Sequence, residues 1–223
     1  MPRETTSVSR EDYLKVIWEF VQDEQVPISA RLAEELGVTP PAVTAALKRM
    51  TRDGLLRVGR GGEIRLTRKG RSAAARLELR HQLAEKLLTD VIGLDWTRAH
   101  DAAERLEHGI SPEVEALLLQ RFGKDSSCPH GLPLRGGLAR LRRARGAVSL
   151  SEVPPGRTVE ILCVYEKDPK FLQFLDGREL RPGARVRVLH REYDETTTVS
   201  VSGRKVYLGK PATSRIWGRE VPS

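Results

Sequence analysis

Cysteine is scarce in this chain of 223 residues, which holds only Cys128 and Cys163. The two lie far apart in different surroundings, so we expect reduced thiols rather than a disulfide framework. No apolar run approaches the roughly 18 residues that a membrane-spanning helix needs, and nothing in the first thirty residues resembles a signal peptide or transit sequence. We therefore expect a cytoplasmic protein with no membrane partner.

Motifs typical of enzymes are missing as well. The sequence has no separate nucleophile or base motif and no glycine loop that would cradle a phosphate. These absences argue against a catalytic protein, and a metal-dependent hydrolase remains only as a less favoured alternative. The hydrophobic content of 39% is sufficient for real cores, and the length fits one or two compact domains.

Positive charge is abundant, with a formal net charge of +8 at pH 7. Lysine and arginine placed opposite phosphates release counterions, so this balance favours a polyanionic partner. Charge alone is weak evidence, because many basic proteins bind no nucleic acid. The question is whether the basic residues coincide with an element that fits a DNA groove.

Residues 1–70 predict a winged helix-turn-helix. Apolar positions recur at three and four residues over 9–23, which predicts an amphipathic helix with its first residue as the N-cap. A second helix over 28–36 ends at Gly37, and Thr39 is expected to cap the third helix. Two short alternating runs follow, around a glycine-rich hairpin tip.

The third helix is the element that would enter a DNA groove. Small groups near its N-terminus allow close approach to base edges, and two arginines lie near its end. The arginine at the hairpin tip could reach a phosphate or a narrow groove. A winged helix used for protein contacts is the alternative. The predicted DNA-contacting residues are Thr39, Pro41, Ala42, Thr44, Arg49, Arg52 and Arg60.

The strongest chemical signal is a cluster of histidines and glutamates between residues 81 and 108. Four of its members recur at spacings that place them within roughly 100° of one face of an α-helix. These four are His100, Glu104, Glu107 and His108. Any single pair is better explained as solvated side chains, but carboxylates crowded together repel one another without a cation. The whole set therefore favours a metal site.

Residues 71–125 predict a helical metal-binding and dimerisation domain. A long apolar helix runs to about Ile92, a second carries the cluster, and a third spans 111–122. Their excess apolar surface suggests a homodimer, which would match a palindromic operator, although ordinary packing within the chain explains it nearly as well. Residues 126–147 are interpreted as a linker, whose Cys128 and His130 are too few for a structural zinc site.

From residue 148 onward the sequence consists of short runs in which apolar and polar residues alternate, separated by proline and glycine. This pattern predicts a small antiparallel SH3-like β-barrel over 148–223, with strands at 158–164, 185–190, 197–201 and 205–208. The predicted class is therefore α+β, with a winged helix-turn-helix, a helical domain and an SH3-like domain in that order.

The order of these parts resembles the diphtheria toxin repressor family of metal-dependent transcriptional regulators. The resemblance is most specific over 81–95, over 100–108 and at the turn Cys128-Pro129-His130-Gly131. It implies a dimeric repressor of double-stranded operator DNA with a divalent metal as co-repressor and no organic cofactor. A metal-independent winged-helix regulator that senses an organic ligand is the alternative, and it would require an apolar pocket.

The resemblance also implies two metal sites per chain. The primary site corresponds to Asp12, Glu104, Glu107 and His108. The ancillary site corresponds to His81, Glu85 and His100, with Glu166 and Asp168 as further ligands from the SH3-like domain. The family's second ligand from that domain is a glutamine three positions after the first, where this chain has Pro169.

Two departures bear on the metal, because iron-responsive relatives have a methionine and a cysteine where this chain has Asp12 and Glu104. Carboxylates suit Mn²⁺, so the resemblance implies a manganese sensor, with Fe²⁺, Co²⁺, Zn²⁺ or Cd²⁺ as substitutes. The metal would join the first helix to the dimer-side helices and set the separation of the two recognition helices. DNA binding is expected to weaken below about pH 6, because His108 and the carboxylates then take up protons that compete with the metal.

Overall fold

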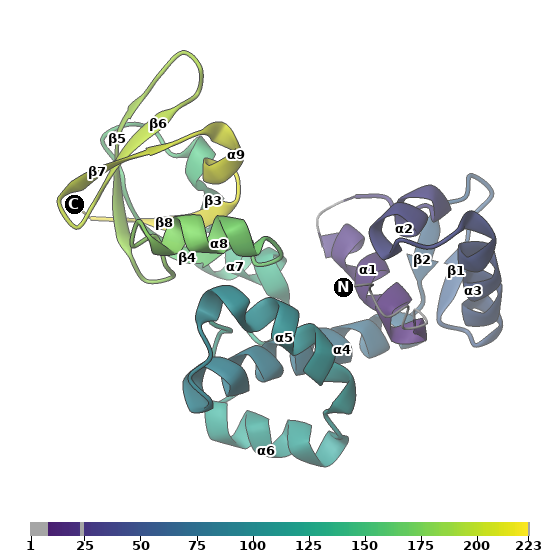
Figure 1. Ribbon diagram of the computed structural model, residues 1–223. Coiled ribbons are helices and arrows are strands. Elements are labelled where there is room, and N and C mark those ends of the chain that lie inside the picture. The colour runs from purple at the N-terminus through teal and green to yellow at the C-terminus, as the bar shows by residue number, and fades with distance from the viewer. Residues whose placement is uncertain (1–8, 23–24, 223) are drawn as a thin grey trace, which may run out of the picture. The chain divides into compact units, whose positions relative to one another are not determined.

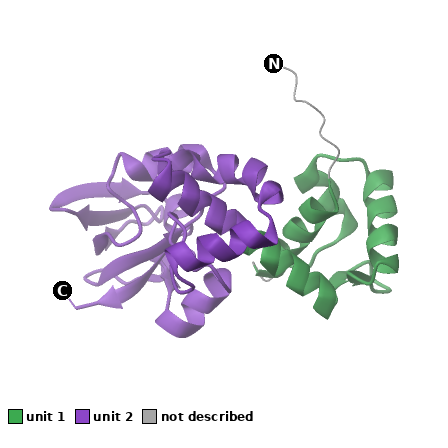
Figure 2. Ribbon diagram, turned by 90° about the horizontal axis from the view of Figure 1, so that it is seen from below, with its two compact units in different colours: residues 1–79 green, residues 80–223 purple. Residues whose placement is uncertain are grey.

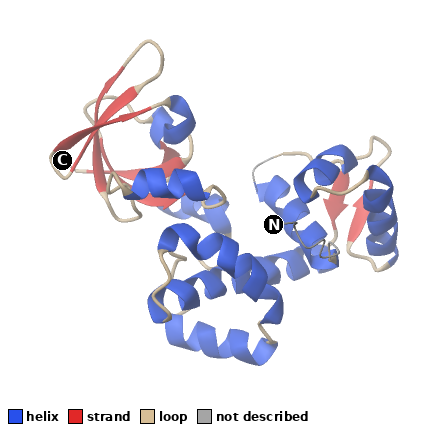
Figure 3. Cartoon of the chain, viewed as in Figure 1, coloured by secondary structure: helices blue, strands red, loops and turns tan. Residues whose placement is uncertain are grey.

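The computed structural model describes residues 9–22 and 25–222 (Figure 1). The chain divides into two compact units, residues 1–79 and residues 80–223 (Figure 2). Helices dominate the first unit and the beginning of the second, whereas strands dominate the end of the second (Figure 3). No helix in the described part of the chain is long and apolar enough to cross a membrane.

The first unit contains the predicted winged helix-turn-helix. Its elements are α1 (Arg10–Gln22), α2 (Ser29–Leu36), α3 (Pro40–Arg52), β1 (Leu56–Val58), β2 (Ile64–Leu66) and the start of α4 (Arg68–Lys86). Ser9 caps α1 as predicted, because its hydroxyl accepts from the Asp12 amide at 3.2 Å. Gly37 ends α2 with φ of 61°, a left-handed conformation that glycine adopts without steric cost.

One detail of the third helix differs from prediction. Thr39 occupies the N-cap position of α3, but its side chain makes no capping hydrogen bond. The next two residues are Pro40 and Pro41, which carry no N–H and so remove two of the donors that a cap would satisfy. The start of α3 therefore depends on the two prolines, whose fixed φ suits the first helical turn, and not on a hydrogen bond from Thr39.

The helices of the second unit are more irregular than predicted. After α4 come a π-helical turn (Leu87–Val91), a short 3₁₀ turn (Trp96–Arg98), α5 (Ala99–Leu106), a second 3₁₀ turn (Glu107–Gly109) and α6 (Pro112–Phe122). The long helix predicted to reach Ile92 thus leaves α-helical geometry at residue 87, and the amide of Ile92 bonds to the Leu87 carbonyl. Ser111 caps α6 through the Val114 amide at 3.2 Å.

A helix, α7 (Gly137–Arg145), lies within the stretch that was predicted to be a linker. Its apolar side is supplied by Leu138 and Leu141, which pack with Leu162 and Trp217 of the sheet. With so few apolar positions the helix lacks the repeating pattern by which sequence analysis finds amphipathic helices.

The C-terminal part of the second unit is an antiparallel sheet in the order β3-β8-β4-β5-β6-β7. The strands are β3 (Val148–Ser149), β4 (Thr158–Val164), β5 (Arg185–Arg191), β6 (Thr197–Val201), β7 (Arg204–Leu208) and β8 (Ile216–Val221), with a 3₁₀ turn (Leu150–Glu152), α8 (Pro169–Asp176) and α9 (Lys210–Thr213) between them. The SH3-like strands are confirmed, and β3 and β8 are additional. Within the described residues no pairing joins β3 to β7, so the predicted closed barrel is an open six-stranded sheet.

Strand β4 is buried on both faces over its second half. Its register against β8 shifts between Ile161 and Cys163. Ile161 packs in the core of the sheet, whereas Leu162 and Cys163 pack toward α7. A bulge of this kind bends a strand and re-aims its side chains.

Candidate metal centre and DNA-reading surface

The residues predicted to contact DNA lie on the outer face of α3 and at the tip between β1 and β2. Val43, Ala46, Leu47 and Met50 are buried in the core of the unit. All seven residues predicted to contact DNA are exposed, including Arg60 at the tip between β1 and β2. The hydroxyl of Thr44 donates to the Pro40 carbonyl at 3.1 Å, which holds it against the helix. The exposed face of α3 therefore carries small side chains at its N-terminal end and arginines at its C-terminal end.

A cluster of six ionisable side chains, five of them buried and Glu166 partly exposed, lies in the second unit. Two come from α4, one from α5, two from the loop before α7 and one from the segment after β4. They are His81, Glu85, His100, Cys128, His130 and Glu166, hereafter the buried cluster. Glu85 and His130 are fully buried, although charged residues are rarely found at such positions without partners.

The turn from Cys128 to Gly131 brings two of these residues to the cluster. Gly131 has φ of 93°, and a Cβ atom there would meet the Leu162 carbonyl oxygen at 1.9 Å. Only glycine therefore permits the turn to lie against β4. The Val164 amide donates to the His130 carbonyl at 3.0 Å, which holds the backbone of the turn on the strand.

Three histidines of the cluster lie beside Glu85, and the first two are His81 and His100. His81 Nε2 lies 3.2 Å from Glu85 Oε1 and 3.0 Å from His100 Nδ1. His100 Nδ1 lies 3.5 Å from Glu85 Oε1 and 3.8 Å from Glu166 Oε1. These atoms are close enough to share one cation.

His130 is oriented by a bond that determines its tautomer. Its Nε2 donates to the Trp96 carbonyl at 2.9 Å, so Nδ1 carries no proton when the ring is neutral. Nδ1 faces two carboxylates, at 3.1 Å from Glu85 Oε1 and 3.4 Å from Glu166 Oε2. Metal-bound histidines usually donate one ring N–H to a carbonyl or carboxylate and keep the other nitrogen for the metal, and His130 has the first of these bonds.

Electrostatics in the buried cluster favour positive charge beside the carboxylates. Burial opposes the charged form of His130, but the Glu85 charge together with hydrogen bonds to Cys128, Glu166 and Glu85 outweighs it and holds the pKa of His130 well above its ordinary value. Burial likewise opposes ionisation of Glu85, but His130 and His81 hold its pKa well below its ordinary value. Burial and the two carboxylates raise the pKa of Cys128 well above its ordinary value.

These residues fit a divalent metal ion. Two overlapping sets each place one ligand atom per residue within 4.8 Å of the others. One set is His81, Glu85, His100 and Glu166, and the other is Glu85, Cys128, His130 and Glu166. Glu85 Oε2 is buried without a hydrogen-bond partner, and His130 Nδ1 makes no hydrogen bond of normal geometry although it lies 3.1 Å from Glu85 Oε1. A buried carboxylate oxygen without a partner is costly, and a cation at this position would satisfy it.

The four residues predicted to share one helical face do not share one environment. Glu107 is buried and its Oε2 lies 2.5 Å from His81 Nδ1, so it supports the buried cluster. Glu104 and His108 are exposed, whereas His100 is buried. The prediction assumed one continuous α-helix, but α5 ends at Leu106 and the 3₁₀ turn redirects the last two residues.

Asp12 lies in the first turn of α1, in the unit of residues 1–79. Its Oδ2 accepts from the Ser9 amide at 2.6 Å, so it takes part in the reciprocal cap of that helix. The three residues predicted to share a metal with it belong to the other unit. The grouping of Asp12 with Glu104, Glu107 and His108 therefore stays a prediction.

Asp168 does not join the buried cluster. Its Oδ1 caps α8 by accepting from the Phe171 amide at 3.1 Å, and its Oδ2 pairs with Arg215 at 3.2 Å. Pro169 begins α8, which explains why the neighbouring carboxylate acts as a helix cap. Glu166 is the residue of this segment that reaches the cluster.

Cys128 and His130 were judged too few for a structural zinc site, but the structure places both in the buried cluster. Their ligand spacing was visible, but the other ligands lie about 40 residues earlier and later in the chain, at Glu85 and Glu166. The signal that could have identified them is Gly131, because an obligatory glycine next to a histidine indicates a close backbone approach.

Three family descriptions match the sequence. The N-terminal DNA-binding domain of iron-dependent repressors matches residues 5–61. The metal-binding and dimerisation domain of the same repressors matches residues 67–134. The FeoA domain matches residues 148–220.

Individual relatives extend over most of the chain. The iron-dependent repressor IdeR of Mycobacterium tuberculosis is 39% identical over 189 residues, which cover 80% of this chain and 82% of that protein. The diphtheria toxin repressor of Corynebacterium diphtheriae is 35% identical over 210 residues, covering 89% and 91%.

Solved structures give the same result. A manganese-dependent transcriptional repressor in complex with manganese has a TM-score of 0.84 at 30% identity, with 96% of this chain and 100% of that chain covered. The IdeR of T. acidophilum has a TM-score of 0.76 at 28% identity, covering 97% and 100%. The homologues are DNA-binding repressors rather than enzymes. This chain therefore belongs to the diphtheria toxin repressor family of metal-dependent transcriptional repressors.

Proposed function

We propose that this protein is a homodimeric repressor that binds a palindromic operator of metal-homeostasis genes when a divalent metal is present. The observation that carries the proposal is the buried cluster itself, in which six potential ligands converge and Glu85 Oε2 has no hydrogen-bond partner. Buried carboxylates gathered with imidazoles give a reason for metal dependence that is independent of the resemblance to relatives.

The proposed DNA contacts lie on the outer face of α3 and at the tip between β1 and β2. Thr39, Pro41, Ala42 and Thr44 would approach base edges, where small side chains permit close packing against the thymine methyl group. Arg49, Arg52 and Arg60 would bind phosphates and fix the register of the helix in the major groove. Their exposure beside a buried apolar stripe supports this assignment.

Two metal sites per chain are proposed. The first is the buried cluster, with Glu85 and Glu166 common to both possible ligand sets. The second is the set implied by the family, Asp12 with Glu104, Glu107 and His108. Because Asp12 belongs to one unit and the other three residues to the other, an ion bound by all four would join the two units.

Mn²⁺ is the proposed physiological metal, with Fe²⁺, Co²⁺, Zn²⁺ and Cd²⁺ as substitutes. Carboxylates and imidazoles dominate both sets, and these ligands suit Mn²⁺. One structural relative is a manganese-dependent repressor solved in complex with manganese, which is in line with this choice. Cys128 is the only sulfur ligand among the described candidates, and its thiolate would favour Zn²⁺ or Cd²⁺.

The proposed switch operates through the position of the first unit. In the absence of metal, Asp12 and the carboxylates of the second unit repel one another, so the two recognition helices of a dimer sample many separations. A bound ion supplies the positive charge that reverses this repulsion. The separation of the recognition helices then matches successive major grooves of the operator.

The test is metal-dependent binding of a selected operator. A duplex is first enriched from a random-sequence pool by the full-length protein with Mn²⁺, and binding is then measured by fluorescence anisotropy. Mn²⁺, Fe²⁺ and Zn²⁺ are titrated against a chelator for the native chain, Asp12→Ala and Glu107→Ala. Tight binding in the presence of chelator would reject the metal switch. Absence of binding under every metal would reject the repressor.

A further inference from the structure

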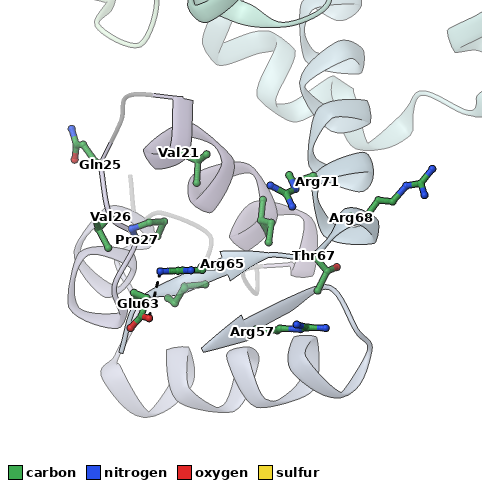
Figure 4. Close-up of a pocket in the computed structure, with 12 residues that line it drawn as sticks. Val21, Gln25, Val26, Pro27, Arg57, Glu63, Arg65, Thr67, Arg68 and Arg71 are labelled. Atoms are coloured by element: carbon green, nitrogen blue, oxygen red, sulfur yellow. Dashed lines mark ion pairs between the residues drawn. The ribbon is translucent and has the colours of Figure 1, made fainter. Parts of the chain in front are cut away.

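The first unit contains a surface pocket that none of the predicted DNA contacts explains. It has a volume of about 640 Å³ and is formed by the end of α1, the segment before α2, the β1–β2 hairpin and the start of α4 (Figure 4). We call it the wing pocket and define it by six of the residues that line it. They are Val21, Pro27, Arg57, Arg65, Arg68 and Arg71.

Positive charge is concentrated in the wing pocket. Four arginines line it, and the described lining contains one acidic residue, Glu63, whose Oε1 lies 3.8 Å from Arg65. These five charged residues leave a net charge of +3. All four arginines are exposed, so their guanidinium groups can reorient toward a ligand without leaving a buried position.

The hairpin places two of these arginines in direct opposition. Arg57 is the cross-strand partner of Arg65 in the antiparallel register of β1 and β2. Like charges opposite one another destabilise a strand pair. Residues on either side of this pair are apolar, with Leu56 opposite Leu66 and Val58 opposite Ile64. The like-charged pair is therefore an exception within an otherwise ordinary hairpin.

The start of α4 adds charge of the same sign. Arg68 is the first residue of this 19-residue helix and Arg71 follows one turn later, with no acidic residue in the first turn. The N-terminus of a helix carries partial positive charge, which makes arginine unfavourable there. Two separate elements thus place repelling charges around one pocket, an arrangement that an anionic ligand would relieve.

We propose that the wing pocket binds phosphate groups. Guanidinium groups pair with phosphate through two parallel hydrogen bonds, which gives arginine an advantage over lysine at such sites. The arginines are spread along the pocket rather than gathered at one point (Figure 4), which suits a ligand with more than one phosphate. Two sources share this chemistry, consecutive backbone phosphates of DNA and a free phosphorylated molecule whose carbon skeleton contacts Val21 and Pro27.

The first arm of the test uses free ligand. Inorganic pyrophosphate is titrated into the full-length protein by isothermal calorimetry in the absence of DNA. The pocket variant is Arg57→Gln with Arg65→Gln, and the matched control is Arg185→Gln with Arg187→Gln, which removes two exposed arginines from β5. If the ligand is a free molecule, the pocket variant binds pyrophosphate at least tenfold more weakly and the control binds it as the native chain does.

The second arm uses a random-sequence duplex, so that its result does not depend on metal or on a selected operator. Each phosphate contact that is lost lowers the slope of log affinity against log salt by about 0.9. If the phosphates come from DNA, the pocket variant therefore loses about 2 from this slope and the control loses nothing. The proposal is overturned if the pocket variant behaves as the control does in both arms.

Discussion

The buried cluster and the family's primary set contain similar side chains in opposite settings. The buried cluster is assembled within one unit, and its histidines are already positioned by hydrogen bonds such as that from His130 to Trp96. The primary set is divided, with Asp12 in one unit and the exposed Glu104 and His108 in the other. A site that is already assembled favours tight metal binding. A site whose ligands belong to two units suits a switch, because metal binding there has to bring the ligands of the two units together.

Among the variants that distinguish the two sites, replacement of Glu85 should have the largest effect on metal binding. Glu85 is common to both ligand sets of the buried cluster, so Glu85→Gln should weaken Mn²⁺ binding there by at least about 100-fold, above the usual cost of removing a residue that only supports a ligand. Equilibrium dialysis with Mn²⁺ measures the stoichiometry and affinity. Glu160→Gln, which breaks a surface pair with Arg219, is the control. Unchanged stoichiometry and affinity in the Glu85 variant would show that the buried cluster does not hold the metal.

Loss of Asp12 should separate the two sites. Asp12→Ala is expected to lower operator affinity in saturating Mn²⁺ by about 30-fold, within the range of ordinary allosteric coupling. Metal binding at the buried cluster should stay within about twofold of the native value, because Asp12 lies in the other unit. Because Asp12 also caps α1, Asp12→Asn is needed beside it, since asparagine keeps the cap. If Asp12→Asn binds the operator normally, the role assigned to the carboxylate is wrong.

Between the usual value of 6.5 and the raised pKa of His130, metal binding at the buried cluster should weaken by about tenfold for each unit by which the pH falls, the effect of one displaced proton. Without metal, the pKa of His130 is raised above its usual 6.5, so its proton is lost only as pH rises through that raised value. An ion must displace this proton, and its affinity therefore increases with pH. The pKa of Glu85 is lowered, so Glu85 stays ionised across this range. Calorimetry in two buffers of different ionisation enthalpy counts the protons released, and no release would contradict the assignment of His130.

The raised pKa of His130 predicts the opposite pH trend for the stability of the metal-free protein. A raised pKa in the fold adds stability that is fully present below about pH 6.5 and is lost as pH rises through the raised value. The free energy of unfolding in the presence of chelator should therefore decline on the alkaline side, while metal affinity rises. Urea unfolding at several pH values measures it.

Replacing sulfur by oxygen should give the smallest effect and test which ligand set is used. Cys128→Ser should weaken Cd²⁺ and Zn²⁺ binding by about tenfold and Mn²⁺ binding by less than about threefold, because thiolate is a soft ligand. Cys163→Ala is the control, since burial raises the pKa of Cys163 to about 12 and the residue only packs in the core. Equal losses for all metals would indicate a packing defect, and no loss for any metal would favour the set with His81 and His100.

Much of the first unit followed from local signals. The cap at Ser9, the glycine after α2 and the period of the buried stripe on α3 each depend on residues a few positions apart. Prediction failed where a distant contact decides the local structure. The helix α7 exists because Leu138 and Leu141 find Leu162 and Trp217, which no pattern within 137–145 reveals. The same is true of β8, which is paired with β3 and β4.

The sequence by itself determined the types of potential ligand, their clustering on the helices between 81 and 108, and the alternation of buried and exposed positions on α3. Helical periodicity and ligand chemistry are properties of neighbouring residues, so they can be recognised without a fold. The tertiary structure decided which ligands meet. Glu107 lies inward against His81, Asp168 caps α8, and the turn from Cys128 to Gly131 packs on β4. The contact of Glu107 with His81 and that of the turn with β4 join segments far apart in the chain, so no local sequence pattern predicts them.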